Sequence, residues 1–196
     1  MAEPKRRMGN IDSAMAQSML TATEDVLKEE GYAALTSRRV AEYVGVKQRL
    51  VYYYFATMDD LIIESFRRLA IRDLERLRNS VSSDHPLHDI WDAGVNTADS
   101  RLVAEFMALA YRNEGLRVEV AKFIEDARDI QVAAIRKTLS NSENLKDLKP
   151  VALALLSSSV ALAMSREAAI GVTKGHQTVK RLIKRFCDEL ENPGTA

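Results

Sequence analysis

Residues 36–55 read TSRRVAEYVGVKQRLVYYYF. Thr36 is a suitable N-cap for a short helix that ends at Gly45, where glycine can adopt the left-handed backbone of a turn without steric cost. A second short helix follows the glycine. Ala41 lies four residues before Gly45 and Val51 lies six residues after it. A small and an apolar residue at these positions let two helices approach and share a core, which is typical of a helix-turn-helix.

The outward side of the second helix carries residue types that read DNA. Gln48, Arg49, Tyr52 and Tyr53 recur at three- and four-residue spacing, so they share one face. Arginine can bind guanine with two hydrogen bonds, glutamine can bind adenine, and Leu50 can contact a thymine methyl group. Tyrosine hydroxyls commonly bind phosphates. This face therefore predicts a recognition helix for the major groove.

Positive charge is concentrated in the same stretch. Between Thr36 and Ala56 the net charge is +3, from Arg38, Arg39, Lys47 and Arg49 against Glu42. The whole chain has 28 Lys and Arg against 28 Asp and Glu, so its net charge is zero and names no partner. A solvated helical hairpin with incidental arginines is the alternative, but the combination of basic and aromatic residues favours DNA binding.

The remainder of the 196-residue chain predicts an all-α fold, because apolar residues recur at helical spacing nearly everywhere. Leu50–Phe55 is rich in β-forming residues, but its place in the helix-turn-helix favours a helix. Thr57 and Asp60 resemble a capping box that opens a long helix. Helices are expected at about residues 11–30, after Thr36, at 46–55, from 57 through 77, and at 87–98, 101–112, 116–139, 149–170 and 178–190.

Residues 19–66 resemble the DNA-binding region of the tetracycline-repressor (TetR) family. The matching segments are Glu29-Glu30-Gly31-Tyr32, Leu35-Thr36, Arg39-Val40-Ala41, Gly45-Val46, Tyr52-Tyr53-Tyr54-Phe55 and Asp59-Asp60-Leu61. The resemblance covers about a quarter of the chain. It implies an N-terminal three-helix DNA-binding domain at 1–58 and a larger helical domain at 59–196 that binds a ligand and dimerises.

The resemblance also implies roles for individual residues. Thr36 would cap its helix and touch a phosphate, with Ser37 and Arg38 against the DNA beside it. The expected DNA-binding residues are Thr36, Ser37, Arg38, Lys47, Gln48, Arg49, Leu50, Tyr52, Tyr53 and Tyr54. The family often has smaller residues where Lys47, Arg49 and Leu50 stand, and a lysine where Met58 stands, so an unfamiliar operator is expected. Residues 5–7 (Lys-Arg-Arg) are either an arm near the minor groove or a solubilising tail.

The second half of the chain is expected to supply the dimer interface and a pocket. Val151–Met164 is rich in Ala and Ser, which allow close helix contacts, and the last helix has an apolar stripe. The last two helices of two copies would then form a four-helix bundle, the alternative being an ordinary core within one chain. Candidate ligand-binding residues are Trp91, Phe106, Met107, Tyr111, Phe123 and Met164, although large residues on middle helices are more often simple core.

Other classes of protein have little support. No cofactor-binding motif or catalytic constellation is visible, so neither a cofactor nor enzymatic activity is expected. His85, His88 and Asp89 have metal-compatible spacing but are read as solvated loop residues, and no metal is expected. Cys187, beside Lys184 and Arg185, is read as packing. No stretch reaches the roughly 18 apolar residues of a membrane span, and a cytoplasmic location is expected.

Two hypotheses follow. The first is a ligand-responsive regulator, most simply a repressor, that binds a palindromic DNA operator as a homodimer and is released by a small, partly hydrophobic effector. The second is a helical ligand-binding or scaffold protein that has lost sequence-specific DNA binding. The basic residues of the helix-turn-helix favour the first hypothesis.

Overall fold

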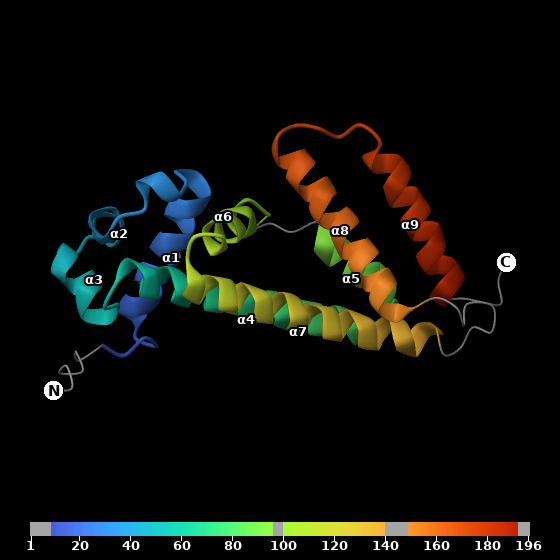
Figure 1. The fold of residues 1–196 in the computed structure, drawn as a ribbon, viewed down its shortest axis with the longest axis horizontal. Coiled ribbons are helices and arrows are strands. Elements are labelled where there is room, and N and C mark those ends of the chain that lie inside the picture. The colour runs from blue at the N-terminus through green and yellow to red at the C-terminus, as the bar shows by residue number, and fades with distance from the viewer. Residues whose placement is uncertain (1–8, 96–99, 140–148, 192–196) are drawn as a thin grey trace. The chain divides into compact units, whose positions relative to one another are not determined.

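The computed structural model describes residues 9–95, 100–139 and 149–191, and within these ranges the chain is helical without a strand. The prediction of an all-α fold with an N-terminal helix-turn-helix is confirmed (Figure 1). The helices are α1 (Ala14–Glu29), the short 3-10 helix η1 (Tyr32–Ala34), α2 (Ser37–Val44), α3 (Gln48–Tyr54), α4 (Met58–Val81), α5 (Pro86–Val95), α6 (Ser100–Ala110), α7 (Glu114–Leu139), α8 (Pro150–Ala169) and α9 (His176–Glu191).

The helices group into two compact units. The N-terminal unit contains α1–α3, α4 as far as Ala70, α6 from Arg101, and α7 as far as Ala121. The C-terminal unit contains α5, α8, α9 and the remaining parts of α4 and α7. The functional boundary after Met58 remains a prediction, since this grouping describes packing alone.

Local signals set the ends of the helices in the N-terminal unit. The Thr36 hydroxyl accepts a hydrogen bond from the Arg39 N–H at 3.1 Å, which caps α2. Gly45 ends α2 in the left-handed conformation with φ of 76°. The Asp60 N–H donates to the Thr57 hydroxyl at 3.0 Å, and the Asp60 carboxylate accepts from the Thr57 N–H at 2.9 Å. The predicted cap and capping box are both confirmed.

The helix-turn-helix has the expected core. Val40, Ala41, Val51 and Phe55 are all buried, whereas most other residues of α2 and α3 are exposed or half-buried. Burial of each large apolar side chain contributes about 2 kcal/mol. This shared core explains why the β-forming residues Leu50–Tyr54 are helical, although Phe55, predicted to end the helix, has extended backbone and follows it: Val51 meets α2 only if the segment turns with helical period.

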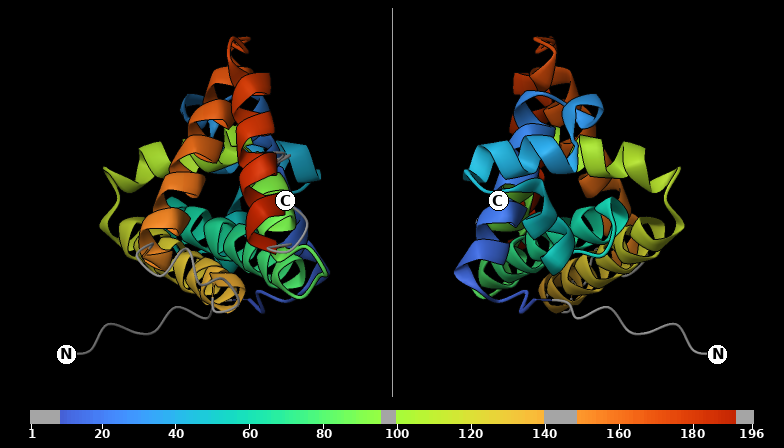
Figure 2. Two further views of the ribbon diagram at one scale, coloured as in Figure 1. Left: turned by 90° about the vertical axis from the view of Figure 1, so that its right-hand side faces the viewer. Right: turned by 90° about the vertical axis from the view of Figure 1, so that its left-hand side faces the viewer.

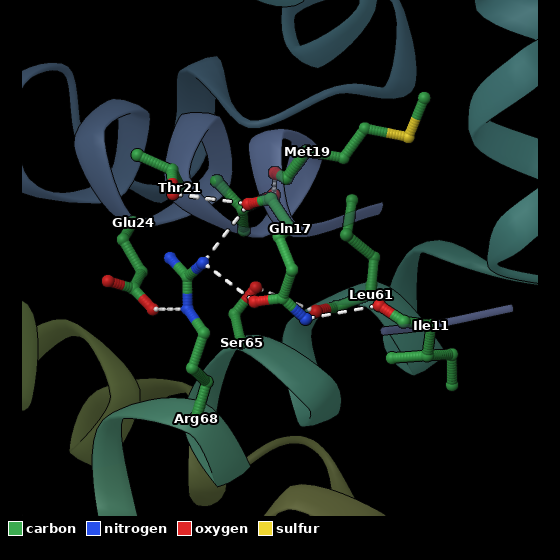
Figure 3. Close-up of polar contacts among 9 residues, drawn as sticks. Ile11, Gln17, Met19, Thr21, Glu24, Leu61, Ser65 and Arg68 are labelled. Atoms are coloured by element: carbon green, nitrogen blue, oxygen red, sulfur yellow. Dashed lines mark hydrogen bonds and ion pairs between the residues drawn. The ribbon is translucent and has the colours of Figure 1, made fainter. Parts of the chain in front are cut away.

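A polar network joins α1 to α4 (Figure 3). The Arg68 guanidinium donates to the Glu24 carboxylate at 2.9 Å and to the Gln17 carbonyl at 3.0 Å. Gln17 in turn donates from its amide to the Ile11 carbonyl at 3.1 Å. The Arg68 and Glu24 side chains are only 20% and 11% exposed, so little water competes for these bonds. The network therefore fixes α1, and with it the helix-turn-helix, on the first half of α4.

The C-terminal unit is held mainly by apolar packing. In Figures 1 and 2, α8 and α9 run antiparallel beside each other. One cluster joins Ala154 near the start of α8 to Leu190 near the end of α9. A second cluster places Trp91 of α5 against Ala161 and Met164 of α8.

Helix α8 corrects the expectation that no stretch of the chain is long and apolar enough to span a membrane. Among the described helices, α8 is long and apolar enough to cross a membrane by length and composition, although only 22% of that stretch is buried within the chain. The serines that interrupt the apolar run bond to their own helix: the Ser157 and Ser158 hydroxyls donate to the Ala154 carbonyl at 3.2 and 2.7 Å. Serine hydroxyls satisfied in this way interrupt an apolar surface less than the sequence suggests.

Candidate DNA-binding surface

The residues of α3 divide into a buried side and an exposed side. Val51 is buried against α2, whereas Lys47, Gln48 and Arg49 are exposed. Within the described part of the chain, Lys47 and Arg49 form no ion pair. Their charges are therefore available to a phosphate or a base, as expected for a recognition helix.

Ser37 lies where the sequence did not place it. It was expected to face DNA, but only 5% of it is exposed, and its hydroxyl lies between α2 and α3. The Gln48 amide nitrogen donates to the Ser37 oxygen at 2.8 Å, and the Ser37 hydroxyl donates to the Tyr52 hydroxyl oxygen at 3.0 Å. Any part that Ser37 plays in DNA recognition therefore acts through Gln48 and Tyr52.

The basic residues of α2 point to different partners. Arg38 is exposed and forms a surface ion pair with Glu42 at 3.3 Å. Arg39 instead donates three hydrogen bonds to the Glu30 carboxylate and lies over the ring of Tyr43 at 5.7 Å. The hydrogen bonds from Arg39 lower the pKa of Glu30. Arg39 thus ties α2 to the end of α1, and its charge is already matched by a carboxylate.

Tyrosines border the exposed face of α3. Tyr53 is 53% exposed, while Tyr52 and Tyr54 are half-buried. The rings of Tyr53 and Tyr54 meet edge to face, with centroids 5.1 Å apart. Thr36 is exposed and Leu50 is half-buried, so parts of both remain accessible.

Gly9 contacts the end of α3, a feature that the sequence analysis missed. The Gly9 N–H donates to the Tyr53 carbonyl at 2.9 Å. A Cβ at this position would lie 2.5 Å from two ring carbons of Tyr54 and 2.7 Å from a ring carbon of Tyr53. Only glycine permits this approach, because any side chain would displace the rings. The basic residues 5–7 precede Gly9 in the sequence but lie outside the described residues.

The candidate ligand-binding residues fall in both units. The structure brings Trp91 and Met164 together in one buried cluster of the C-terminal unit. Phe123 is half-buried and belongs to the same unit. In the N-terminal unit, Phe106 is fully buried against Phe66.

The two remaining candidates also lie in the N-terminal unit. Met107 is half-buried, but Tyr111 is 86% exposed because it follows the last turn of α6. An aromatic side chain on the surface of a single chain supplies little of the enclosure that a small-molecule site needs.

Arg128 was not singled out from the sequence. Its Nε is buried, and no hydrogen-bond partner lies within the described residues. Arg128 is four residues from Ile124 and from Val132, and Val132 packs on the apolar core. A basic residue in an apolar stripe of α7 was the available sequence signal.

The histidines and the cysteine have structural partners. His88 contacts Asp188 at 2.9 Å and His85 contacts Glu191 at 3.3 Å. Among the described residues, no group of three or more potential ligands is arranged to hold a metal. Burial, together with nearby carboxylates such as Glu191, raises the pKa of Cys187 to about 12. The neighbouring basic residues therefore do not activate this thiol.

Residues 19–64 match the family model described as bacterial regulatory proteins, tetR family. None of the curated proteins has a sequence that matches the chain. A TetR transcription regulator from Haloarcula marismortui has a similar fold, with a TM-score of 0.74 and 22% identity over 89% of this chain and 96% of that chain.

Two further solved structures have the same fold. A protein assigned as a TetR-family regulator from Rhodococcus sp. has a TM-score of 0.76 and 18% identity over 92% of this chain and 100% of that chain. A protein assigned as a transcriptional regulator from Saccharomonospora viridis, in complex with choline, has a TM-score of 0.75 and 15% identity over 90% of this chain and 95% of that chain. Residues 19–64 therefore match the tetR family of bacterial regulatory proteins, and the chain as a whole has the fold of solved TetR-family transcriptional regulators.

Proposed function

We propose that the protein is a ligand-responsive transcriptional repressor that binds a palindromic operator as a homodimer. A small, partly hydrophobic effector releases it from DNA. It works in the cytoplasm without catalytic chemistry, a cofactor or a metal. The observation that carries this proposal is the exposed face of α3, where Lys47, Gln48 and Arg49 stand beside a buried helix-turn-helix core.

DNA recognition uses the two helices for different purposes. Gln48, Arg49 and Leu50 face base edges in the major groove, and Arg49 pairs with a guanine. Thr36 and Arg38 at the start of α2, together with Lys47 and the tyrosines of α3, bind phosphates. These phosphate contacts set the position of α3, and the base contacts supply the sequence preference.

Dimerisation uses the outer side of α8. Between Val151 and Ala163, the exposed residues of this helix recur at helical spacing and are apolar or small: Val151, Ala152, Leu155, Leu156, Ser159, Leu162 and Ala163. Leu156 alone is 62% exposed. Such a stripe is unfavourable in water, and a second copy covers it when α8 and α9 of both chains form a four-helix bundle. Pairing then presents two recognition helices to half-sites about 34 Å apart.

Effector binding is assigned to the C-terminal unit. Trp91 and Met164 supply an apolar surface for it. The Saccharomonospora protein of similar fold was solved in complex with choline, a small organic molecule. A thousandfold loss of operator affinity requires about 4 kcal/mol of preference for the conformation that does not bind DNA.

Trp91 offers a direct measurement of effector binding. The chain has one tryptophan, so its fluorescence reports on the second apolar cluster alone. Titration with a panel of small organic compounds is expected to change that fluorescence for one chemical class. The same compounds should lower operator affinity, and a compound that quenches Trp91 without affecting DNA binding contradicts the proposed coupling.

DNA recognition is tested by selecting bound duplexes from a random library at near-physiological salt. The intact protein should enrich a palindrome with two half-sites. Arg49→Ala should lower affinity for that palindrome at least about fivefold, since one guanine contact contributes about 1–3 kcal/mol. Arg117→Ala is the matched control, because Arg117 is an exposed arginine of α7 that pairs with Glu114. A folded dimer that enriches no sequence would instead support a ligand-binding or scaffold protein.

A further inference from the structure

Three polar side chains between α2 and α3 form a hydrogen-bonded chain with a direction. The Gln48 amide donates to the Ser37 oxygen at 2.8 Å, and the Ser37 hydroxyl donates to the Tyr52 oxygen at 3.0 Å. Ser37 is buried, so its one proton and one of its lone pairs are both committed within the protein. Gln48 and Tyr52 lie on α3, at the edge of the surface assigned to DNA.

We propose that Ser37 is a positioning residue that determines which groups of Gln48 face the bases. With one amide N–H held by Ser37, Gln48 presents its Oε1 acceptor and its second N–H to the groove. Adenine offers the matching pair in the major groove, an N6–H donor beside the N7 acceptor. The inference rests on the proposed function, and it assigns an adenine to the position in each half-site that faces Gln48.

Tyr52 determines which groups donate and which accept in this series of hydrogen bonds. Its oxygen accepts from Ser37, so the proton of Tyr52 is left to donate outward. Phosphate oxygens only accept hydrogen bonds, and a phosphate beside Tyr52 therefore favours this direction. In the opposite direction, Tyr52 would donate to Ser37 and Ser37 to the Gln48 oxygen. Tyr52 would then turn lone pairs toward the phosphate, and Gln48 would lose its outward acceptor.

The hydrogen bonds from Gln48 through Ser37 to Tyr52 thus couple a contact with the DNA backbone to a contact with a base. A phosphate held by Tyr52 favours the orientation of Gln48 that selects adenine, although Ser37, which links them, touches neither group of the DNA. Such coupling raises specificity, because Gln48 is oriented for adenine only when α3 is correctly seated on the backbone.

The experiment compares base preferences in the random-library selection for the intact protein and for four variants: Gln48→Ala, Ser37→Ala, Tyr52→Phe and Ser37→Thr. The intact protein should enrich adenine at one position of each half-site, and Gln48→Ala should abolish that preference. Ser37→Ala and Tyr52→Phe should each reduce it about fivefold, the effect of one orienting hydrogen bond, and leave other positions unchanged. Ser37→Thr, which keeps the hydroxyl, should retain the preference.

A second measurement separates positioning from stability and from phosphate binding. Affinity for a duplex of random sequence should be unchanged in Ser37→Ala and lower in Tyr52→Phe, which removes a phosphate donor. If Ser37→Ala and Tyr52→Phe retain the adenine preference, or lose preference equally at all positions, the inference is overturned. Failure of the intact protein to enrich any sequence would contradict the proposed function itself, a result distinct from altered preference at one position.

Discussion

The outer faces of α3 and α8 are both exposed in a single chain, but their chemistry is opposite. At α3 the exposed residues include Arg49 and the preceding Lys47, which have no ion-pair partner among the described residues. On α8 they include Val151, Leu155 and Leu156. Unpaired cations suit a polyanion, whereas an apolar stripe suits a similar stripe on a second copy. We therefore expect the two surfaces to bind partners of different chemistry.

The interiors behind these faces also differ. The N-terminal unit fixes α1 on α4 through the Arg68–Glu24 pair, a directional contact with little solvent access. The C-terminal unit relies on apolar clusters around Ala154 and Trp91. Directional polar contacts suit a helix-turn-helix that must hold one geometry, and apolar clusters can repack around a ligand.

The largest effect is expected from a charge on the outer face of α8. Leu156→Glu would bury a carboxylate in the proposed interface, which costs several kcal/mol and should convert the dimer to monomer at micromolar concentration. Sedimentation measures this change. Val118→Glu is the control, because Val118 is similarly exposed on α7. If Leu156→Glu remains dimeric, another surface joins the two copies.

The next effect concerns the polar network of the N-terminal unit. Arg68→Met should lower the free energy of unfolding by about 2–3 kcal/mol, because it removes the guanidinium from Glu24 and Gln17. Arg67→Met is the matched control: Arg67 pairs with Glu64 and Glu119 but is 46% exposed, so its loss should cost less than about 1 kcal/mol. Denaturant unfolding at fixed protein concentration compares the two, and equal losses would contradict a larger contribution from the less exposed Arg68.

A smaller effect is expected where the N-terminal segment meets α3. Gly9→Ala forces the Tyr53 and Tyr54 rings to move and should cost about 1–2 kcal/mol of unfolding free energy. Operator affinity should fall as well, since these rings border the exposed face of α3. Deletion of residues 2–7, which leaves Gly9 in place, should keep the stability of the intact chain. An unchanged melting temperature for Gly9→Ala would show that the contact is dispensable.

The smallest effect concerns Cys187, which should be inert near neutral pH. Because its pKa is raised to about 12, the folded chain keeps the thiol protonated while the unfolded chain ionises. Stability should therefore be unaffected below about pH 8 and should fall as pH rises further, by about 1 kcal/mol at pH 10. The control is Cys187→Ala, whose free energy of unfolding should lack this decrease at high pH. Rapid maleimide labelling of the folded protein at pH 8 would contradict the assigned burial.

Features that depend only on nearby residues could be predicted from the amino-acid sequence. The Thr36 cap, the Gly45 turn and the Thr57–Asp60 capping box are local hydrogen-bonding and conformational preferences. The period of apolar residues was sufficient for the all-α class and for the core position of Val51. The first helix begins at Ala14 and not near residue 11, because Ser13 provides the N-cap.

The pairing of polar groups distant in sequence depends instead on how the helices pack. Ser37 is buried by α3, eleven residues from Gln48 and fifteen from Tyr52. Arg39, which contributes to the net charge of +3 between Thr36 and Ala56, is paired with Glu30. The surroundings of Cys187 reversed the effect expected from its basic neighbours in sequence. Sequence spacing shows which residues share a helix face, but the partner of a polar side chain depends on which other helix packs against that face.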